Sequence, residues 1–139
     1  MGSEADALLD QLGFSTLVSF GSVNWHDVPD TPGVYVIFDD AAIVYVGMAG
    51  RDGAGSLRKR LRDHASGQIV NMFAQYLLFA RLLGRESQPR TPREAKTACR
   101  AHIAANCRFR VLSLADASRA RATERELRER LRPEFNRLS

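Results

Sequence analysis

The sequence predicts an α+β fold, with a small three-stranded antiparallel sheet that is flanked by helices. Two short apolar runs, residues 33–38 and 42–47, are separated only by a short turn, so they predict a β-hairpin. Residues 109–114 predict one later strand. The segments around these runs place apolar residues at helical spacing, which predicts helices rather than more strands.

The chain before the hairpin predicts one helix and an extended lead-in. Residues 4–19 begin as an amphipathic helix that Gly13 breaks, and a turn-rich segment with prolines, residues 25–32, leads into the first strand. We therefore expect a single globular unit, with residues 1–29 as helix and lead-in and residues 30–139 as the main domain.

The hairpin places one tyrosine on each strand. If residues 39–41 form a three-residue loop, Tyr35 lies directly opposite Tyr45, and both project from the same face of the sheet. Two neighbouring phenols can bury as an aromatic pair or line a polar site. The helix that follows contains Arg60 and His64, one turn apart on one face, which favours a site.

Four helices are expected after the hairpin. Ser56 can cap a helix that runs to about Ser66 and ends at Gly67. Residues 69–83 are apolar nearly all round, which predicts a buried core helix. Helices over residues 92–106 and from about 116 to 131 complete the series, the first with proline in its first turn.

The charges are divided unevenly along the chain. All 20 Lys and Arg residues lie after residue 50, whereas residues 1–50 contain seven of the 16 acidic residues. A basic part of this kind, rich in arginine, indicates a polyanionic partner such as nucleic acid; the alternative is a set of solvated helix faces. Six arginines are candidates for phosphate contacts: Arg51, Arg58, Arg62, Arg85, Arg90 and Arg93.

The same composition argues against several other classes of protein. No apolar run is long enough to span a bilayer, and Cys99 and Cys107 have neither metal-ligand spacing nor a disulfide framework. We expect reduced thiols and a cytoplasmic protein, with its oligomeric state left open.

Each strand of the hairpin carries one glycine and one tyrosine in a tripeptide, Gly33-Val34-Tyr35 on the first and Tyr45-Val46-Gly47 on the second. These tripeptides resemble the two that give the GIY-YIG nuclease superfamily its name, each with one Ile-to-Val change. The family arginine on the following helix matches Arg60 within a Leu-x-x-Arg-Leu pattern. A histidine four residues later, His64, is similar to the restriction-enzyme branch of the superfamily.

The last helix extends the resemblance to about residues 30–136. The family glutamate, with a proline nine residues on and an asparagine twelve residues on, matches Glu124, Pro133 and Asn136. The resemblance implies endonucleolytic cleavage of DNA phosphodiester bonds with one divalent ion, Mg²⁺ or Mn²⁺, held by Glu124. From the residues alone, an i, i+4 pair of Glu124 with Arg128 on a solvated helix is favoured, and Asn136 could be a simple cap.

The chemistry of the residues fits such a reaction. One carboxylate can hold Mg²⁺ while water and phosphate oxygens complete its shell, and an arginine can grip the scissile phosphate as a fork. The general base stays open among Tyr35, Tyr45 and His64. A phenol has a pKa of about 10 and a histidine one of about 6.5, which favours His64 as the proton acceptor.

Other functions remain open at this level. The alternatives are a non-catalytic nucleic-acid-binding module on the same scaffold, a nuclease that acts on RNA, and a protein-interaction domain whose basic residues are only solvated.

Overall fold

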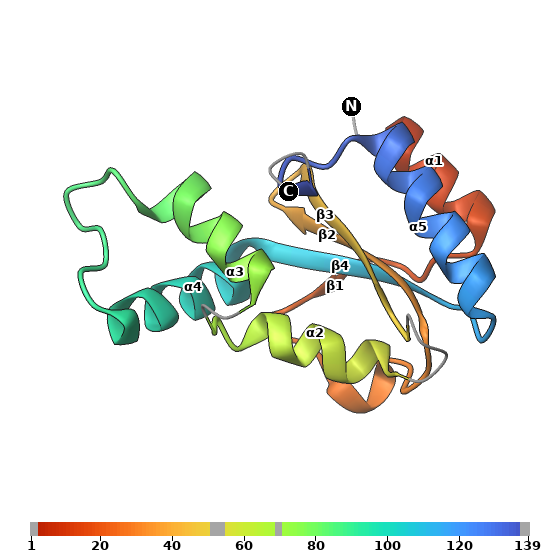
Figure 1. Cartoon of the computed structure of the whole chain (residues 1–139), viewed down its shortest axis with the longest axis horizontal. Helices are drawn as coiled ribbons and strands as arrows, with labels where there is room; N and C mark the ends of the chain where they lie inside the picture. The colour runs from red at the N-terminus through yellow and green to blue at the C-terminus, as the bar shows by residue number, and fades with distance from the viewer. Residues whose placement is uncertain (1–2, 51–54, 69–70, 137–139) are drawn as a thin grey trace.

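A computed structural model of the chain describes residues 3–50, 55–68 and 71–136, and Figure 1 shows its course. The chain forms helices on both faces of one sheet. In chain order the elements are α1 (Ser3–Leu12), β1 (Val18–Ser19), η1 (Trp25–Asp27), β2 (Gly33–Asp39), β3 (Ala42–Ala49), α2 (Leu57–Ala65), α3 (Met72–Leu77), η2 (Leu78–Leu82), α4 (Pro92–Asn106), β4 (Cys107–Ser113) and α5 (Ala117–Leu131).

The sheet is antiparallel with the strand order β1-β4-β2-β3, so the α+β class is confirmed. The expectation of three strands is wrong, because the described residues form four. The additional strand, β1, pairs Val18 with Phe109 and Ser19 with Arg108. Two residues are too few to produce an alternating pattern, which is why the sequence does not reveal this strand.

Helices cover both faces of the sheet (Figure 1), and an apolar layer lies between the sheet and the helices on each face. On one face, Leu57 and Leu61 of α2, Phe73 of α3 and Ile103 of α4 pack together with Tyr35. On the other face, α1 and α5 cover the remaining side chains of the hairpin. That second layer is built from Leu9, Phe14, Val34, Val36, Phe38, Val46, Met48, Ala120 and Leu127. Alternation along β2 and β3 thus supplies both layers.

Polar caps set the beginnings of the long helices. The side chains of Ser56, Thr91 and Asp116 accept hydrogen bonds from the free backbone N–H groups of α2, α4 and α5. After α2, Gly67 takes a positive φ of 74°, which only glycine adopts without strain. The expected start of α2, with its arginine and histidine, is therefore confirmed.

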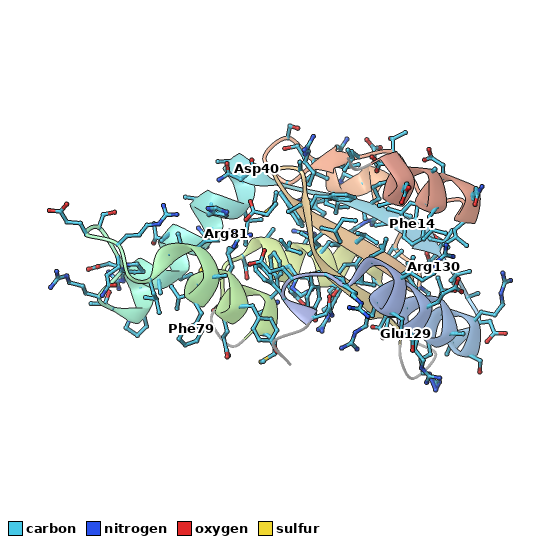
Figure 2. The ribbon with its side chains drawn as sticks, turned by 90° about the horizontal axis from the view of Figure 1, so that it is seen from above. Phe14, Asp40, Phe79, Arg81, Glu129 and Arg130 are labelled. Atoms are coloured by element: carbon cyan, nitrogen blue, oxygen red, sulfur yellow. The ribbon has the colours of Figure 1, made fainter. Side chains whose placement is uncertain are left out.

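The expectation of one buried helix over residues 69–83 is wrong. Within the described part of that segment, α3 is followed by the π-helical turn η2, and only one stripe of side chains faces the core. Phe73 and Leu77 are fully buried, but Met72 and Phe79 are 48% and 69% exposed. Phe79 lies at the outer side of this segment in Figure 2. An all-round apolar pattern exceeds what one side of a sheet can cover.

None of the helices in the described ranges has the length and apolarity that crossing a bilayer requires.

Candidate active site

The register of the hairpin differs from the expected one. A two-residue turn and one extra residue in β3 replace the three-residue loop, so Tyr35 pairs with Gly47 and Tyr45 pairs with Ile37. The opposition of Tyr35 and Tyr45 is therefore wrong. The two rings still share one face of the sheet and lie 6.2 Å apart between centroids.

The glycine opposite Tyr35 makes room for its ring. A Cβ atom at Gly47 would overlap the Tyr35 hydroxyl and lie only 2.6 Å from the ring carbon that bears it. The phenol thus crosses over the neighbouring strand at the one residue that has no side chain. The pairing of Tyr35 with a glycine on the next strand therefore determines the position of the Tyr35 hydroxyl.

Tyr35 ends against the imidazole of His64, and Asn71 lies behind the imidazole. The two short contacts are Tyr35 Oη to His64 Nε2 at 2.6 Å and His64 Nδ1 to Asn71 Oδ1 at 2.9 Å. The same Asn71 oxygen accepts the backbone N–H of Phe73, so it is the acceptor for Nδ1–H as well. In the neutral imidazole Nε2 is then an acceptor, and the Tyr35 hydroxyl donates to it.

Burial holds this pair in its uncharged form. Tyr35 is 0% exposed and His64 is 1% exposed. Burial, with the charge of Arg60 as a smaller contribution, lowers the pKa of His64 to about 3. Burial also raises the pKa of Tyr35 above that of a free phenol, although Arg60 acts in the opposite direction. The pKa of about 6.5 that favoured His64 as the proton acceptor therefore does not apply to this buried imidazole.

Tyr45 is the motif phenol with access to solvent. Its ring is half-buried and packs against His64 and Phe73, with centroid distances of 5.8 and 5.7 Å. Burial raises the pKa of Tyr45, the charge of Arg60 lowers it, and the charge of Glu124 raises it. Arg60 itself is exposed on α2, and its pKa is raised, chiefly by Tyr35. The phenols, the guanidinium and the carboxylate therefore lie within electrostatic reach of one another.

Glu124 comes from α5, on the other layer of the structure. Glu124 is 8% exposed and forms part of the wall of an open groove of about 700 Å³. Arg128, one turn later, has a guanidinium nitrogen 4.0 Å from Glu124 Oε1, so the i, i+4 pair is present. Because β3 is the edge strand, α5 brings Glu124 close to Tyr45 although the two belong to different layers.

Asn136 lies in the segment after α5 and binds the backbone of β3. Its Oδ1 accepts the N–H of Val46 at 2.7 Å, and its Nδ2 donates to the Val46 carbonyl at 3.0 Å. Phe135 N–H donates to the carbonyl of Val44 at 2.7 Å. Asn136 therefore fastens the chain after α5 to the strand that carries Tyr45.

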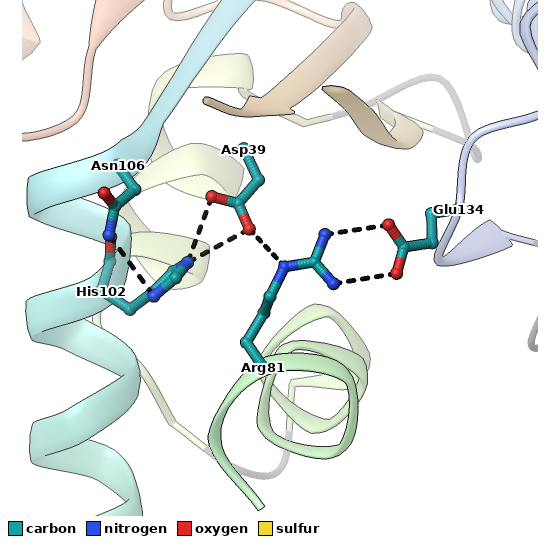
Figure 3. A network of polar contacts seen from close by, with 5 residues as sticks. All are labelled: Asp39, Arg81, His102, Asn106 and Glu134. Atoms are coloured by element: carbon teal, nitrogen blue, oxygen red, sulfur yellow. Dashed lines mark hydrogen bonds and ion pairs between the residues drawn. The ribbon is translucent and has the colours of Figure 1, made fainter. Parts of the chain in front are cut away.

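A second polar cluster holds the same segment from the other side (Figure 3). Arg81 of η2 donates to Asp39 at 2.9 Å and to both carboxylate oxygens of Glu134 at 2.9 and 2.8 Å. His102 donates to Asp39 at 3.1 Å, with Asn106 Nδ2 against its other ring nitrogen. The sequence assigned no role to His102. We assign this cluster to the fold, because its charges are paired with each other.

The cluster also brings potential metal ligands together. Atoms of Asp39, His102 and Cys107 lie within 4.8 Å of one another. Burial, reinforced by the charge of Asp39, raises the pKa of the Cys107 thiol to about 12. A neutral thiol is a poor ligand, and Arg81 already supplies Asp39 with a positive partner. This group is therefore not where we place the cation.

The six arginines that the sequence selected have different surroundings. Arg58 donates to the carbonyls of Val28 and His26 at 3.0 and 3.3 Å, so it joins α2 to the lead-in. Arg62 is exposed on the same helix, and Arg51 lies outside the described residues. The other three, in the loop before α4 and in its first turn, are exposed at the end of the molecule opposite α5 (Figure 1): Arg85, Arg90 and Arg93.

The sequence analysis did not select the arginines around Glu124 as candidates for phosphate contacts. Four of them line the groove beside it: Arg121, Arg125, Arg128 and Arg132. Their spacing of four, three and four residues is visible in the sequence and is typical of one face of a helix. This spacing alone would have identified the four arginines as one surface.

Comparisons with known proteins add no relative to these observations. No protein-family model matches the chain, and a search of curated proteins found no match.

Proposed function

We propose that this protein is a divalent-cation-dependent endonuclease of the GIY-YIG type, which hydrolyses phosphodiester bonds in nucleic acid, with DNA as the substrate. One observation supports this most strongly. Arg60 and Glu124, on different layers, both act electrostatically on the two buried or half-buried phenols, Tyr35 and Tyr45. Clustering of this kind, with perturbed pKa values, is typical of active sites.

The donor atoms at Glu124 fit a hydrated Mg²⁺ or Mn²⁺ ion. Mg²⁺ usually binds through one or two carboxylates and keeps several waters, and the open groove beside the Glu124 carboxylate offers room for them. Asn136 is not a ligand in this proposal, because its amide oxygen accepts the backbone N–H of Val46. When bound, the ion supplies charge stabilisation at the phosphate and acidifies a water.

The exposed members of the cluster act on the reacting atoms. Water attacks phosphorus, one P–O ester bond breaks, and the leaving oxygen takes up a proton. Arg60 binds a non-bridging phosphate oxygen, whose negative charge grows in the transition state. Tyr45 contacts the attacking water, because it is the motif phenol that is open to solvent. Only the ionised phenolate of Tyr45 can accept a proton from the water. Burial raises the pKa of this phenol, and the charge of Arg60 offsets part of that rise, so the phenolate forms more readily beside Arg60 than it would without it.

The buried members are positioning residues. The ring nitrogens of His64 are both hydrogen-bonded, one to Tyr35 and the other to Asn71, so the imidazole has no free nitrogen for a water. The rings of Tyr35 and His64 pack against the Tyr45 ring and hold it in position. We therefore propose Tyr45, and not His64, as the residue that receives the proton.

A cleavage assay tests the proposal. Wild-type protein is incubated with end-labelled single-stranded, duplex and branched DNA and with RNA, in Mg²⁺, in Mn²⁺ and in EDTA. We expect cleavage of at least one DNA in the presence of either ion and none in EDTA. Glu124→Gln should abolish it, because the neutral amide holds a divalent ion poorly.

Glu126→Gln is the matched control, since Glu126 lies two residues away on α5 and pairs with Arg130 on the surface. It should cleave like the wild type. Cleavage by Glu124→Gln at the wild-type rate would refute the proposed active site. Binding of DNA without cleavage by the wild-type protein would instead support a non-catalytic binding module.

A further inference from the structure

The arginines of α5 form a single stripe. At 100° per residue, Arg121, Arg125 and Arg128 lie within about 60° of one another around the axis of α5, and Arg132 follows at its C-cap. They rise along it by about one turn, or 5.4 Å, per arginine. All four are exposed and line the 700 Å³ groove that also contains Glu124.

Among the residues that the structure describes, few of these charges are neutralised by an ion pair. Arg128 approaches Glu124 at 4.0 Å. Within the described ranges, no carboxylate forms an ion pair with Arg121, Arg125 or Arg132. By contrast, Arg110 is buried against Asp6 and Asp10 of α1, so the basic part of the chain does pair its arginines where they are structural.

Arg132 supplies an independent observation. It caps the C-terminal end of α5 in the left-handed conformation, with φ 46° and ψ 61°. Glycine or asparagine ordinarily occupies such a position, because a Cβ atom is strained there. Arg132 nevertheless occupies this position, and it lines the same groove as the other three arginines.

We propose that this stripe binds the phosphate backbone of a nucleic-acid strand and guides it past Glu124. The inference rests on the proposed function for the identity of the polyanion. It names the surface that holds the strand beside the scissile phosphate. A regular row of exposed arginines, one per turn, matches a partner with regularly repeated negative charges.

Two double variants test the stripe. Arg121→Gln with Arg125→Gln removes two of its charges. Arg119→Gln with Arg130→Gln removes two from the opposite side of the same helix, where Arg130 pairs with Glu126. Arg130 can be found in Figure 2 on α5, next to Glu129, which lines the groove. The net charge changes equally, so only the position differs.

The readout is fluorescence anisotropy of a labelled oligonucleotide in EDTA, over a range of salt concentrations, so that binding is measured without cleavage. The stripe variant should bind about tenfold more weakly in 50 mM salt. It should also reduce the slope of log affinity against log salt by about two, one for each lost phosphate contact. The opposite-side variant should match the wild type.

Equal weakening by both double variants would overturn the proposal, since net charge alone would then explain binding. An unchanged salt slope in the stripe variant would overturn it too. If the wild type cleaves DNA while the stripe variant binds it normally, the proposal that the stripe binds DNA is refuted and the proposed nuclease activity is supported. If the stripe variant binds DNA more weakly but the wild type does not cleave it, the binding surface is supported and the proposed nuclease activity is refuted. Competition by an acidic peptide but not by DNA would reject nucleic acid as the partner.

Discussion

Replacing His64 with glutamine should change how the stability of the protein depends on pH. His64 is neutral in the folded protein, with a pKa of about 3, whereas a free histidine has a pKa of about 6.5. Between these values the unfolded chain binds more protons than the folded one, so the free energy of unfolding falls as the pH falls. From pH 6.5 to pH 5 this amounts to about 2 kcal/mol, at 1.36 kcal/mol per pH unit.

The measurement is urea unfolding of the wild type and of His64→Gln at pH 7 and pH 5. Glutamine keeps a donor and an acceptor but does not titrate. The wild type should therefore lose about 2 kcal/mol more than the variant between the two pH values. His26→Gln, at an exposed histidine, should behave like the wild type. Equal pH dependence in the wild type and in His64→Gln would refute the buried neutral imidazole.

Three further substitutions separate stability from function. Arg132→Gly should relieve the left-handed strain, raise the free energy of unfolding by about 1 kcal/mol and the melting temperature by about 4 °C, and still weaken DNA binding. Gly47→Ala should cost about 1–3 kcal/mol and cleavage activity, because its Cβ would overlap Tyr35. Tyr45→Phe should lower the cleavage rate on the order of 100-fold with little change in stability. Differential scanning fluorimetry, anisotropy and the cleavage assay measure these effects.

Matched variants sharpen these comparisons. Asp40→Gly also relieves a positive φ, of 53°, and should stabilise the protein without weakening DNA binding. Tyr35→Phe removes the donor to buried His64 and should cost about 1–3 kcal/mol of stability, unlike Tyr45→Phe. A lower free energy of unfolding in Arg132→Gly than in the wild type would contradict the strain assigned to Arg132. Full cleavage activity in Tyr45→Phe would contradict the role assigned to Tyr45.

The elements themselves could be predicted because their signals are local. Caps at Ser56, Thr91 and Asp116 and the two apolar runs of the hairpin mark where helices and strands begin. The register could not be predicted, because the extra residue in β3 lies among apolar side chains that fit either pairing. That single shift replaces Tyr45 by Gly47 opposite Tyr35.

The surroundings of the site residues depend on tertiary packing. The spacing of Arg60 and His64 places them on one face of α2, yet it does not show that Phe73 and Asn71 enclose the imidazole. Its lowered pKa follows from that enclosure. Similarly, Arg58 counts as a basic residue in the sequence, but the fold commits it to backbone carbonyls of the lead-in.

The dependence of the cleavage rate on Mg²⁺ concentration tests the central proposal most directly. Under single-turnover conditions, with the wild type and Glu124→Gln side by side, one ion held by one carboxylate predicts a hyperbolic rise with a single saturable site. Glu124→Gln should then show no cleavage at any concentration that saturates the wild type. A rate that does not depend on Mg²⁺, or the same saturation curve for both proteins, would contradict the proposed function.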